Sequence, residues 1–373
     1  VMPGNPFTWP AIAPLSPSTT VNSSPWAMKT PLRILGSGMA LLAMGMTHPC
    51  SAQTTPEYRT VKTVALGAPD RWDYVVFDPG SGRVFIAHGD ELTVVDGDSG
   101  AIAGHVKGFP GITHGIALVK DSNRGYTDEG EAGKAASFNL KSLAVEKHIQ
   151  AAEGADAIAF DPVSNHVFII NGDAGTITVI DPKADAAVTT ITVGGKLEYA
   201  VPGEKGKLFV NGAAKREVLS IDTSNNSIAA HWPVPDCESP HGLAIDAGSH
   251  RLFVSCLNQL LTVLDSQSGH IIGTVPIGSG SDAVVFDPKR KLIFSSNGKD
   301  GNISVIDAKD PNHYATLGSI KTAISARTMS INPTTGRLYL ASADIVPNAP
   351  SAKNGRIPTI PGSLKLLFLD PVK

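Results

Sequence analysis

Short apolar runs alternate with polar turns along most of this chain, and the alternation repeats over a long period. The segment 77–85, FDPGSGRVF, places an apolar residue before Asp-Pro, then a polar turn, then an apolar run that ends in an aromatic residue. Successive phrases of this kind start 41 to 45 residues apart. The chain therefore contains seven copies of one structural unit. The other six lie at 118–126 (a degenerate copy), 160–168, 201–209, 245–253, 286–294 and 331–339.

Each copy predicts a four-stranded sheet. The Pro, Gly, Ser and Asn residues of the phrase set a turn, so the flanking apolar runs pair as a hairpin. A third apolar run ending in Asp follows, as at 93–96 and 178–181. A more polar fourth run follows that, as at 101–106 and 270–275. Seven units of four strands predict an all-β fold, a seven-bladed β-propeller.

The two ends of the repeat predict how the ring closes. The last copy ends after its third strand, at LKLLFLDPVK (364–373), and so lacks an outermost strand. The segment YRTVKTVALG (58–67) precedes the first copy and is strand-like. If it supplies the missing strand of the last blade, the ring closes and no sheet edge stays open.

These segments resemble the repeats of YVTN-type β-propeller proteins, of the exported bacterial (YncE-like) kind. TVID at 178–181 follows NGDAGTI, and SVID at 304–307 follows NGKDGNI. The segments CESPHGLAID, SARTMSINPTTGRLYL and IPGSLKLLFLDP carry the same resemblance. It covers residues 58–373 and implies the propeller fold, but it assigns no activity, because such propellers host many functions.

The first 52 residues lack the repeat. Residues 1–27 are rich in Pro and Ser and are interpreted as upstream sequence or a disordered leader. Residues 28–52 are interpreted as a secretory signal peptide: Lys29 and Arg33 precede the apolar stretch 34–46, and CSA precedes Gln53. We therefore expect export to the periplasm or beyond, and a single propeller domain at 53–373.

Charge narrows the classes of partner. The 373-residue chain has a formal net charge of −3, and loss of two basic residues with the signal would make it −5. An acidic protein with scattered basic residues is not expected to bind nucleic acid. No other apolar run is long enough to predict a membrane span. The expected partners are therefore a small-molecule ligand or substrate in the channel, or a protein in the cell envelope.

Two cysteines would remain after removal of the signal. Cys237 and Cys256 form an even pair in a chain expected in an oxidising compartment, which favours a disulfide. A metal site or a catalytic thiol is the less favoured alternative.

One position of the repeat gathers ionisable residues. In a propeller, the loops that enter the first strand of each blade meet on one face around the channel. Twelve residues before the aromatic that ends each phrase, six of the seven positions are ionisable. The exception, Leu197, precedes Glu198, which a shift of one residue would place in the ring. The other six are Asp73, His114, Asp156, His241, Asp282 and Arg327.

This ring suggests metal chemistry. Converging carboxylates repel one another unless a cation offsets them, so Asp73, Asp156, Glu198 and Asp282 are candidate metal ligands. Oxygen donors favour Ca²⁺, and the histidines would also suit Zn²⁺ or Mn²⁺. His241 or His114 would act as general base, and Arg327 would stabilise an oxyanion, which fits a metal-dependent hydrolase. Propeller lactonases resemble this arrangement in architecture only.

Two other interpretations of the ring remain open, a scaffold and a quinone-holding propeller. The ring carboxylates often cap backbone N–H groups in propellers, around a water-filled channel. The protein would then be a non-catalytic scaffold that binds a protein, a polymer or a small ligand on the same face. A propeller holding an organic quinone is less favoured, because no tryptophan-docking motif recurs. Trp72, Tyr74 and Tyr199 flank the ring, where they either stack on a ligand or pack between blades.

Overall fold

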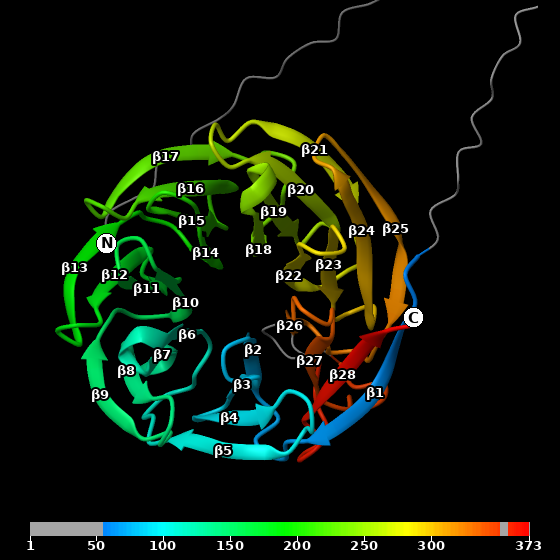
Figure 1. Cartoon of the computed structure of the whole chain (residues 1–373), viewed down its shortest axis with the longest axis horizontal. Helices are drawn as coiled ribbons and strands as arrows, with labels where there is room; N and C mark the ends of the chain where they lie inside the picture. The colour runs from blue at the N-terminus through cyan, green and yellow to red at the C-terminus, as the bar shows by residue number, and fades with distance from the viewer. Residues whose placement is uncertain (1–54, 351–356, 373) are drawn as a thin grey trace, which may run out of the picture. The chain divides into compact units, whose positions relative to one another are not determined.

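A computed structural model of the chain describes residues 55–350 and 357–372. Figure 1 shows seven sheets arranged as a ring around a central channel. Each sheet has four antiparallel strands, so the predicted all-β, seven-bladed β-propeller is confirmed. The expected leader at 1–27 and signal peptide at 28–52 lie outside the described residues. Among the described residues, no helix is long and apolar enough to cross a membrane.

The blades follow one another along the chain, and each runs from an innermost to an outermost strand. Blades 1 to 3 contain β2 (Trp72–Asp78), β3 (Arg83–His88), β4 (Glu91–Asp96) and β5 (Ile102–Lys107); β6 (Ile116–Val119), β7 (Arg124–Glu129), β8 (Lys134–Asn139) and β9 (Val145–Gln150); and β10 (Ala155–Asp161), β11 (His166–Asn171), β12 (Thr176–Asp181) and β13 (Ala186–Thr192). Blades 4 and 5 contain β14 (Ala200–Pro202), β15 (Lys207–Gly212), β16 (Glu217–Asp222) and β17 (Ser227–Pro233); and β18 (Pro240–Asp246), β19 (Arg251–Cys256), β20 (Leu260–Asp265) and β21 (Ile271–Pro276).

Blade 6 contains β22 (Ser281–Asp287), β23 (Leu292–Asn297), β24 (Asn302–Asp310) and β25 (His313–Lys321). Blade 7 contains β26 (Thr328–Ile331), β27 (Leu338–Ser342), β28 (Lys365–Pro371) and, outermost, β1 (Tyr58–Ala65). Three single-turn 3₁₀ helices occupy loops: η1 (Lys120–Ser122), η2 (Gly130–Ala132) and η3 (Ala247–Ser249).

The ring closes as the sequence predicts. β1 pairs antiparallel with β28, with Tyr58 opposite Pro371 and Ala65 opposite Lys365. Arg337 strengthens this junction, because its Nε and Nη2 donate to the two carboxylate oxygens of Asp370 at 2.6 and 2.8 Å. Its Nη1 donates to the backbone oxygen of Gly97 in blade 1 at 2.9 Å. Ladder bonds therefore attach the N-terminal strand to blade 7, and Arg337 joins blade 7 to blade 1.

The hydrophobic core lies between neighbouring blades. One cluster combines Val84 and Ile86 of blade 1 with Tyr339 and Phe368 of blade 7, and all four are buried. Equivalent clusters join the other blades. The two middle strands of each blade are apolar on both faces because both faces pack against a neighbouring sheet.

The channel has two chemically different ends. The residue that opens each repeat phrase lies near the turn between the first and second strands, and all seven of these residues are apolar and half-buried. We call this the turn end; a cavity of about 480 Å³ there is lined mainly by apolar residues. The opposite end, where the loops enter the first strands, is called the funnel end. The seven turn-end residues are Phe77, Leu118, Phe160, Val201, Ile245, Phe286 and Ile331.

Two tyrosines cross the channel between these ends. Tyr74 comes from blade 1 and Tyr199 from blade 4, with two blades between them in the ring. Their ring centroids lie 4.8 Å apart in an edge-to-face arrangement. Tyr74 also packs against the core between blades 3 and 4. These two residues therefore pack on each other, and a ligand at the funnel end would rest above them.

Candidate functional site

The funnel end holds a cavity of about 740 Å³. Its walls come from six blades and from the segment 357–359 in the long connection between β27 and β28. Six of the candidate ring residues line it, and His114 lies beside two of them, Asp73 and Asp156. Leu197 is instead buried in the core between blades 3 and 4, and Glu198 lines the cavity in its place. The other lining ring residues are Asp73, Asp156, His241, Asp282 and Arg327.

Three ring residues form a candidate metal centre. Asp73, His114 and Asp156 come from β2, the loop before β6, and β10, which are consecutive inner segments of blades 1 to 3. Each offers one ligand atom, and these atoms lie within 4.8 Å of one another. Residues more than 80 positions apart thus converge, because each occupies the same position of its repeat. The donor set is two carboxylates and one imidazole.

Asp128 orients the histidine of this centre. It is fully buried near the end of β7; the sequence places it on the funnel face but does not predict that it orients His114. Its Oδ1 lies 2.9 Å from Nδ1 of His114 and accepts from the His114 backbone N–H at 3.1 Å. Its Oδ2 accepts from the backbone N–H of Gly115. Since Nδ1 is occupied by Asp128, Nε2 is the nitrogen left to bind a metal. Carboxylate–histidine–metal arrangements of this kind fix the tautomer and ring orientation of a ligand histidine.

Electrostatics favour a cation among these side chains. Burial raises the pKa of Asp73, and the nearby Arg327 offsets this only in part. Burial and the charges of Asp73 and Glu198 raise the pKa of Asp156 well above its ordinary value. Burial disfavours a charged His114, but Asp128, Asp73 and Asp156 outweigh it and raise its pKa to about 9. A bound divalent ion would relieve the same repulsion that holds these protons.

A second group of ring residues lies beside this centre in blades 4 and 5. Nε2 of His241 lies 3.9 Å from Oε1 of Glu198, and Nδ1 of His241 lies 3.0 Å from the backbone oxygen of Ser239. Nζ of Lys196 lies 2.9 Å from the same Glu198 oxygen. Lys196 is exposed at the rim and lines the cavity. His241 therefore faces the cavity with a carboxylate next to it.

Arg327 and Asp282 form a third group. Nε of Arg327 donates to Asp282 at 2.9 Å, and Nη2 lies 3.6 Å from Asp73. Nη2 also donates to the backbone oxygen of Trp72, and the guanidinium stacks on the Trp72 ring at 4.9 Å from its centroid. Asp282 is thus turned toward Arg327 and is not part of the Asp73–His114–Asp156 cluster. Among the described residues, Nη1 of Arg327 has no hydrogen-bond partner.

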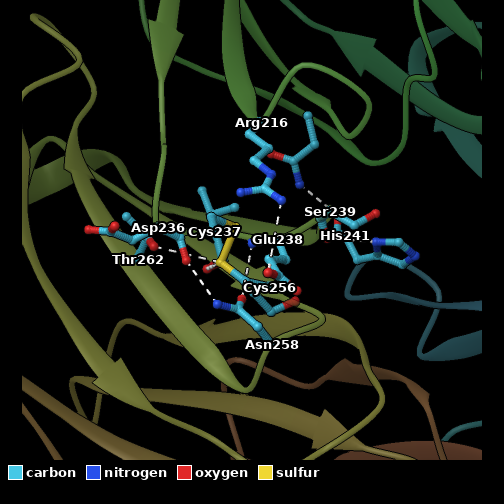
Figure 2. Close-up of a disulfide and its surroundings, with 12 residues drawn as sticks. Arg216, Asp236, Cys237, Glu238, Ser239, His241, Cys256, Asn258 and Thr262 are labelled. Atoms are coloured by element: carbon cyan, nitrogen blue, oxygen red, sulfur yellow. Dashed lines mark hydrogen bonds and ion pairs between the residues drawn. A yellow bond between two sulfur atoms is a disulfide. The ribbon is translucent and has the colours of Figure 1, made fainter. Parts of the chain in front are cut away.

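The two cysteines form the predicted disulfide (Figure 2). Cys237 lies in the loop that enters β18, and Cys256 ends β19. Both are buried, which removes them as a metal or thiol site. His241 lies four residues after Cys237 and extends away from the disulfide. The disulfide therefore anchors the loop that presents His241.

The comparisons with known proteins support the fold and leave the chemistry open. No protein-family model matches the chain. Over 165 residues the chain is 30% identical to "Uncharacterized protein YncE" of Salmonella typhimurium and 29% identical to the protein of that name of Salmonella typhi. The chain is similar to YncE. The match covers 42% of this chain, and the chain spans about half (46%) of the length of the curated relatives it matches.

Solved structures agree on the propeller. A chain of Kuenenia stuttgartiensis hydrazine synthase matches with a TM-score of 0.64 at 13% identity, over 72% of this chain and 92% of that one. A chain from the crystal structure of a mitotic checkpoint complex matches with a TM-score of 0.68 at 14% identity, over 92% and 99%. At this level of identity the likeness shows a shared fold alone.

Proposed function

We propose that the funnel end is the active site of a metal-dependent hydrolase that opens lactone rings. The observation that carries the proposal is the Asp73–His114–Asp156 cluster, whose histidine Asp128 orients; Asp73 and Asp156 line the same cavity of about 740 Å³ as His241. A divalent ion at this cluster would polarise a carbonyl and lower the pKa of water. Glu198, beside His241, would be an outer carboxylate of the site.

The donor set bears on which metal is bound. Ca²⁺ prefers oxygen ligands alone, and it is the ion that the carboxylate-rich ring sequence favours. The imidazole in the cluster also suits Mn²⁺ and Zn²⁺, and its carboxylate partner Asp128 is typical of transition-metal sites. The contacts separate the two histidines: His114 fits a ligand role, and His241 fits that of a base.

In the proposed hydrolysis, His241 and Arg327 have separate roles. His241 would take a proton from water through Nε2 while the water oxygen attacks the lactone carbonyl carbon. Nη1 of Arg327, or the metal, would stabilise the oxyanion that forms. The ring carbon–oxygen bond then breaks, and the departing alkoxide takes the proton back from His241 to give a hydroxy acid. Tyr74 lines this cavity and packs on Tyr199, and substrate and product would both pass through the funnel end.

A non-catalytic scaffold is the second candidate, favoured by one observation. Apolar side chains are exposed in loops at the funnel end, namely Leu257, Ile324, Val346 and Ile360, at 37 to 44% of their area. Exposed apolar residues around a pocket mark interaction sites for proteins or ligands. A scaffold of this kind would bind a saturable partner at the funnel end and would not turn it over.

The experiment is hydrolysis of a panel of lactones by chelator-treated protein with Ca²⁺, Mn²⁺ or Zn²⁺ added back. The proposal expects turnover that disappears on chelation, returns with one of the ions, and is lost in His241→Ala with the fold intact. Full turnover after exhaustive chelation, or in His241→Ala, contradicts it. Saturable binding without turnover of any lactone favours the scaffold.

We also propose that the protein acts outside the cytoplasm, in the periplasm or beyond. The buried disulfide supports this, because disulfides persist in oxidising compartments. Fractionation of the producing cells, with N-terminal sequencing of the recovered protein, tests it. A protein found only in the cytoplasm with residues 28–52 retained contradicts it.

A further inference from the structure

Asn171 and Asn297 occupy the same position of their repeats, the last residue of the second strand, and a third asparagine, Asn211, lies one position earlier in its repeat. In blade 3, Nδ2 of Asn171 donates to the hydroxyls of Thr176 and Thr178, both at 3.0 Å. In blade 6, Nδ2 of Asn297 donates to Asn302 at 2.7 Å and to Ser304 at 2.9 Å. In these two blades the amide fastens the second strand to the third strand of its own sheet.

Asn211 of blade 4 uses its amide differently. In blade 4, Gly212 is the last residue of the second strand and pairs with Glu217, while Asn211 precedes it and pairs with Val218. Successive side chains of a strand point to opposite faces of the sheet, so the Asn211 amide lies on the opposite face from those of Asn171 and Asn297. Nδ2 of Asn211 instead donates across the blade boundary to the backbone oxygen of His241, at 2.6 Å. The Asn211 side chain is fully buried, so this bond has no competition from water.

The same asparagine also holds Glu198. The backbone N–H of Glu198 donates to the backbone oxygen of Asn211 at 2.9 Å. Asn211 therefore connects Glu198 of blade 4 with His241 of blade 5, the two residues whose side chains face each other at 3.9 Å. Asn211 itself does not line the cavity and is not a ring residue, but it helps to set the distance between Glu198 and His241, which do line it.

The loop before His241 sets the tautomer of its ring. Nδ1 lies 3.0 Å from the backbone oxygen of Ser239, and a carbonyl oxygen can only accept, so Nδ1 carries the proton. Ser239 has a positive φ of 47°, which turns its carbonyl toward the ring. In the neutral ring Nε2 then carries no proton, and at 3.9 Å from Glu198 this nitrogen makes no hydrogen bond to that carboxylate.

The other side of this loop is clamped to the end of blade 5's second strand. The side chain of Asn258 accepts from the backbone N–H of Glu238 at 3.0 Å and donates to the backbone oxygen of Asp236 at 2.9 Å (Figure 2). The Cys237–Cys256 disulfide lies between these two bonds. The loop is thus fixed on the blade 5 side by Asn258 and the disulfide, and on the blade 4 side by Asn211.

We infer that Asn211 is a positioning residue that holds His241 as the Nδ1–H tautomer, with the Nε2 lone pair directed to Glu198 and the cavity. Use of that lone pair in catalysis rests on the proposed function. The orientation itself does not, because the tautomer and the Asn211 bond can be measured without any substrate. Asn211 thus links two cavity residues of neighbouring blades.

The direct test is ¹⁵N NMR of the histidine rings in the full-length mature protein, at a pH at which His241 is neutral, with assignment from His241→Ala. The expected wild-type result is a single Nδ1–H tautomer for His241. Asn211→Ala should give a mixture of tautomers or a large shift of both ring nitrogens. Asn297→Ala removes a buried amide that bonds only within blade 6 and should leave the His241 signals unchanged.

Three results overturn the inference: an Nε2–H tautomer in the wild type, unchanged His241 signals in Asn211→Ala, or equal changes in Asn211→Ala and Asn297→Ala. If Asn211→Ala does not fold, Asn211→Ser, whose hydroxyl is too short to reach the His241 oxygen, replaces it, with Asn297→Ser as its control.

Kinetics then separate the inference from the proposed function. If lactones are hydrolysed, Asn211→Ala should lower kcat by about 10- to 100-fold, as loss of orientation does, with KM within about twofold. Asn297→Ala should melt at a lower temperature with kcat unchanged. If the wild type hydrolyses nothing while the NMR result holds, the proposed function fails and the orientation of His241 stands.

Discussion

The two ends of the channel are built from the same seven strands and differ in almost every chemical respect. At the turn end, all seven blades place an apolar, half-buried residue, from Phe77 to Ile331. At the funnel end, four residues earlier (three in blade 4) and in or just before the same strands, the blades place aspartate, histidine, glutamate or arginine. The turn-end residues differ only in size, because each of them packs in the same apolar environment. The funnel end differs from blade to blade, which packing alone does not explain.

The difference is also electrostatic. Away from the channel, carboxylates have found partners that lower their pKa, as Asp370 has with Arg337. At the funnel end, the pKa values of Asp73 and Asp156 are raised, because burial and mutual repulsion oppose their charge. A group of side chains that costs stability in the free protein is typical of a binding or catalytic site.

Asp156→Asn, at the funnel end, should have the largest effect on activity with little effect on stability. The substitution removes one of the three ligand atoms, so we expect lactone hydrolysis to fall by about 10³-fold, and metal affinity by at least 10-fold. The metal-free protein should be as stable as the wild type or more so, since a repelling charge is gone. Activity assays, metal titration and thermal melting check this. Retained activity would contradict the ligand role of Asp156. A large loss of stability would show that its role is structural.

Phe77→Ala should produce the reverse pattern at the turn end. The Phe77 ring stacks on Tyr339, 5.3 Å between centroids, and packs in the core between blades 7 and 1. Its truncation should cost about 2–4 kcal/mol in the free energy of unfolding, with hydrolysis by the folded protein unchanged. Denaturant unfolding and kcat measure the two quantities. A drop in kcat matching that of Asp156→Asn would erase the distinction between the ends.

Removal of the disulfide should affect both stability and the funnel end. The bridge spans 19 residues of sequence, so the Cys237→Ser/Cys256→Ser pair should lose about 3 kcal/mol by the chain-entropy argument. Because the loop that presents His241 loses one anchor, kcat should also fall, by less than in Asn211→Ala. Unfolding curves and kinetics at matched temperature check this. Unchanged kcat would mean that Asn258 and Asn211 hold the loop unaided.

The pH dependence of stability should carry opposite signs for the two kinds of carboxylate. Asp370 has a lowered folded-state pKa, so its contribution is present above the unfolded value of about 3.9 and is lost as the pH falls through the folded value. Asp370→Asn should therefore cost about 1 kcal/mol at neutral pH, and this cost should disappear as the pH falls through the folded-state pKa. The raised pKa of Asp156 works the other way: stability falls as the pH rises above ~4.

Thermal melting of the metal-free protein against pH, with Asp156→Asn and Asp370→Asn as a pair, measures both signs. Asp156→Asn should flatten the loss on the alkaline side, and Asp370→Asn should flatten the loss on the acid side. The same sign of change in both variants would contradict the electrostatic comparison.

The sequence predicts the propeller well because turn residues and strand length recur in every unit. The strand closure followed from an unpaired segment at each end of the repeat. The sequence predicts the ring because equivalent positions of the repeat converge in a propeller. In blade 4 the first strand, β14, has only three residues, so the repeat spacing does not decide whether Leu197 or Glu198 belongs to the ring. Asp128 and Asn211 were missed as orienting residues. Their roles depend on the direction of buried side chains across a sheet, which a repeat pattern does not encode.

Anomalous diffraction from crystals of the mature protein, soaked in Mn²⁺ or Zn²⁺, tests the metal centre most directly. The account predicts one ion at the funnel end, within bonding distance of Asp73, Asp156 and the Nε2 atom of His114, and no ion there in Asp156→Asn. An ion bound elsewhere, or a funnel end that stays free of metal at saturating concentrations, would contradict it.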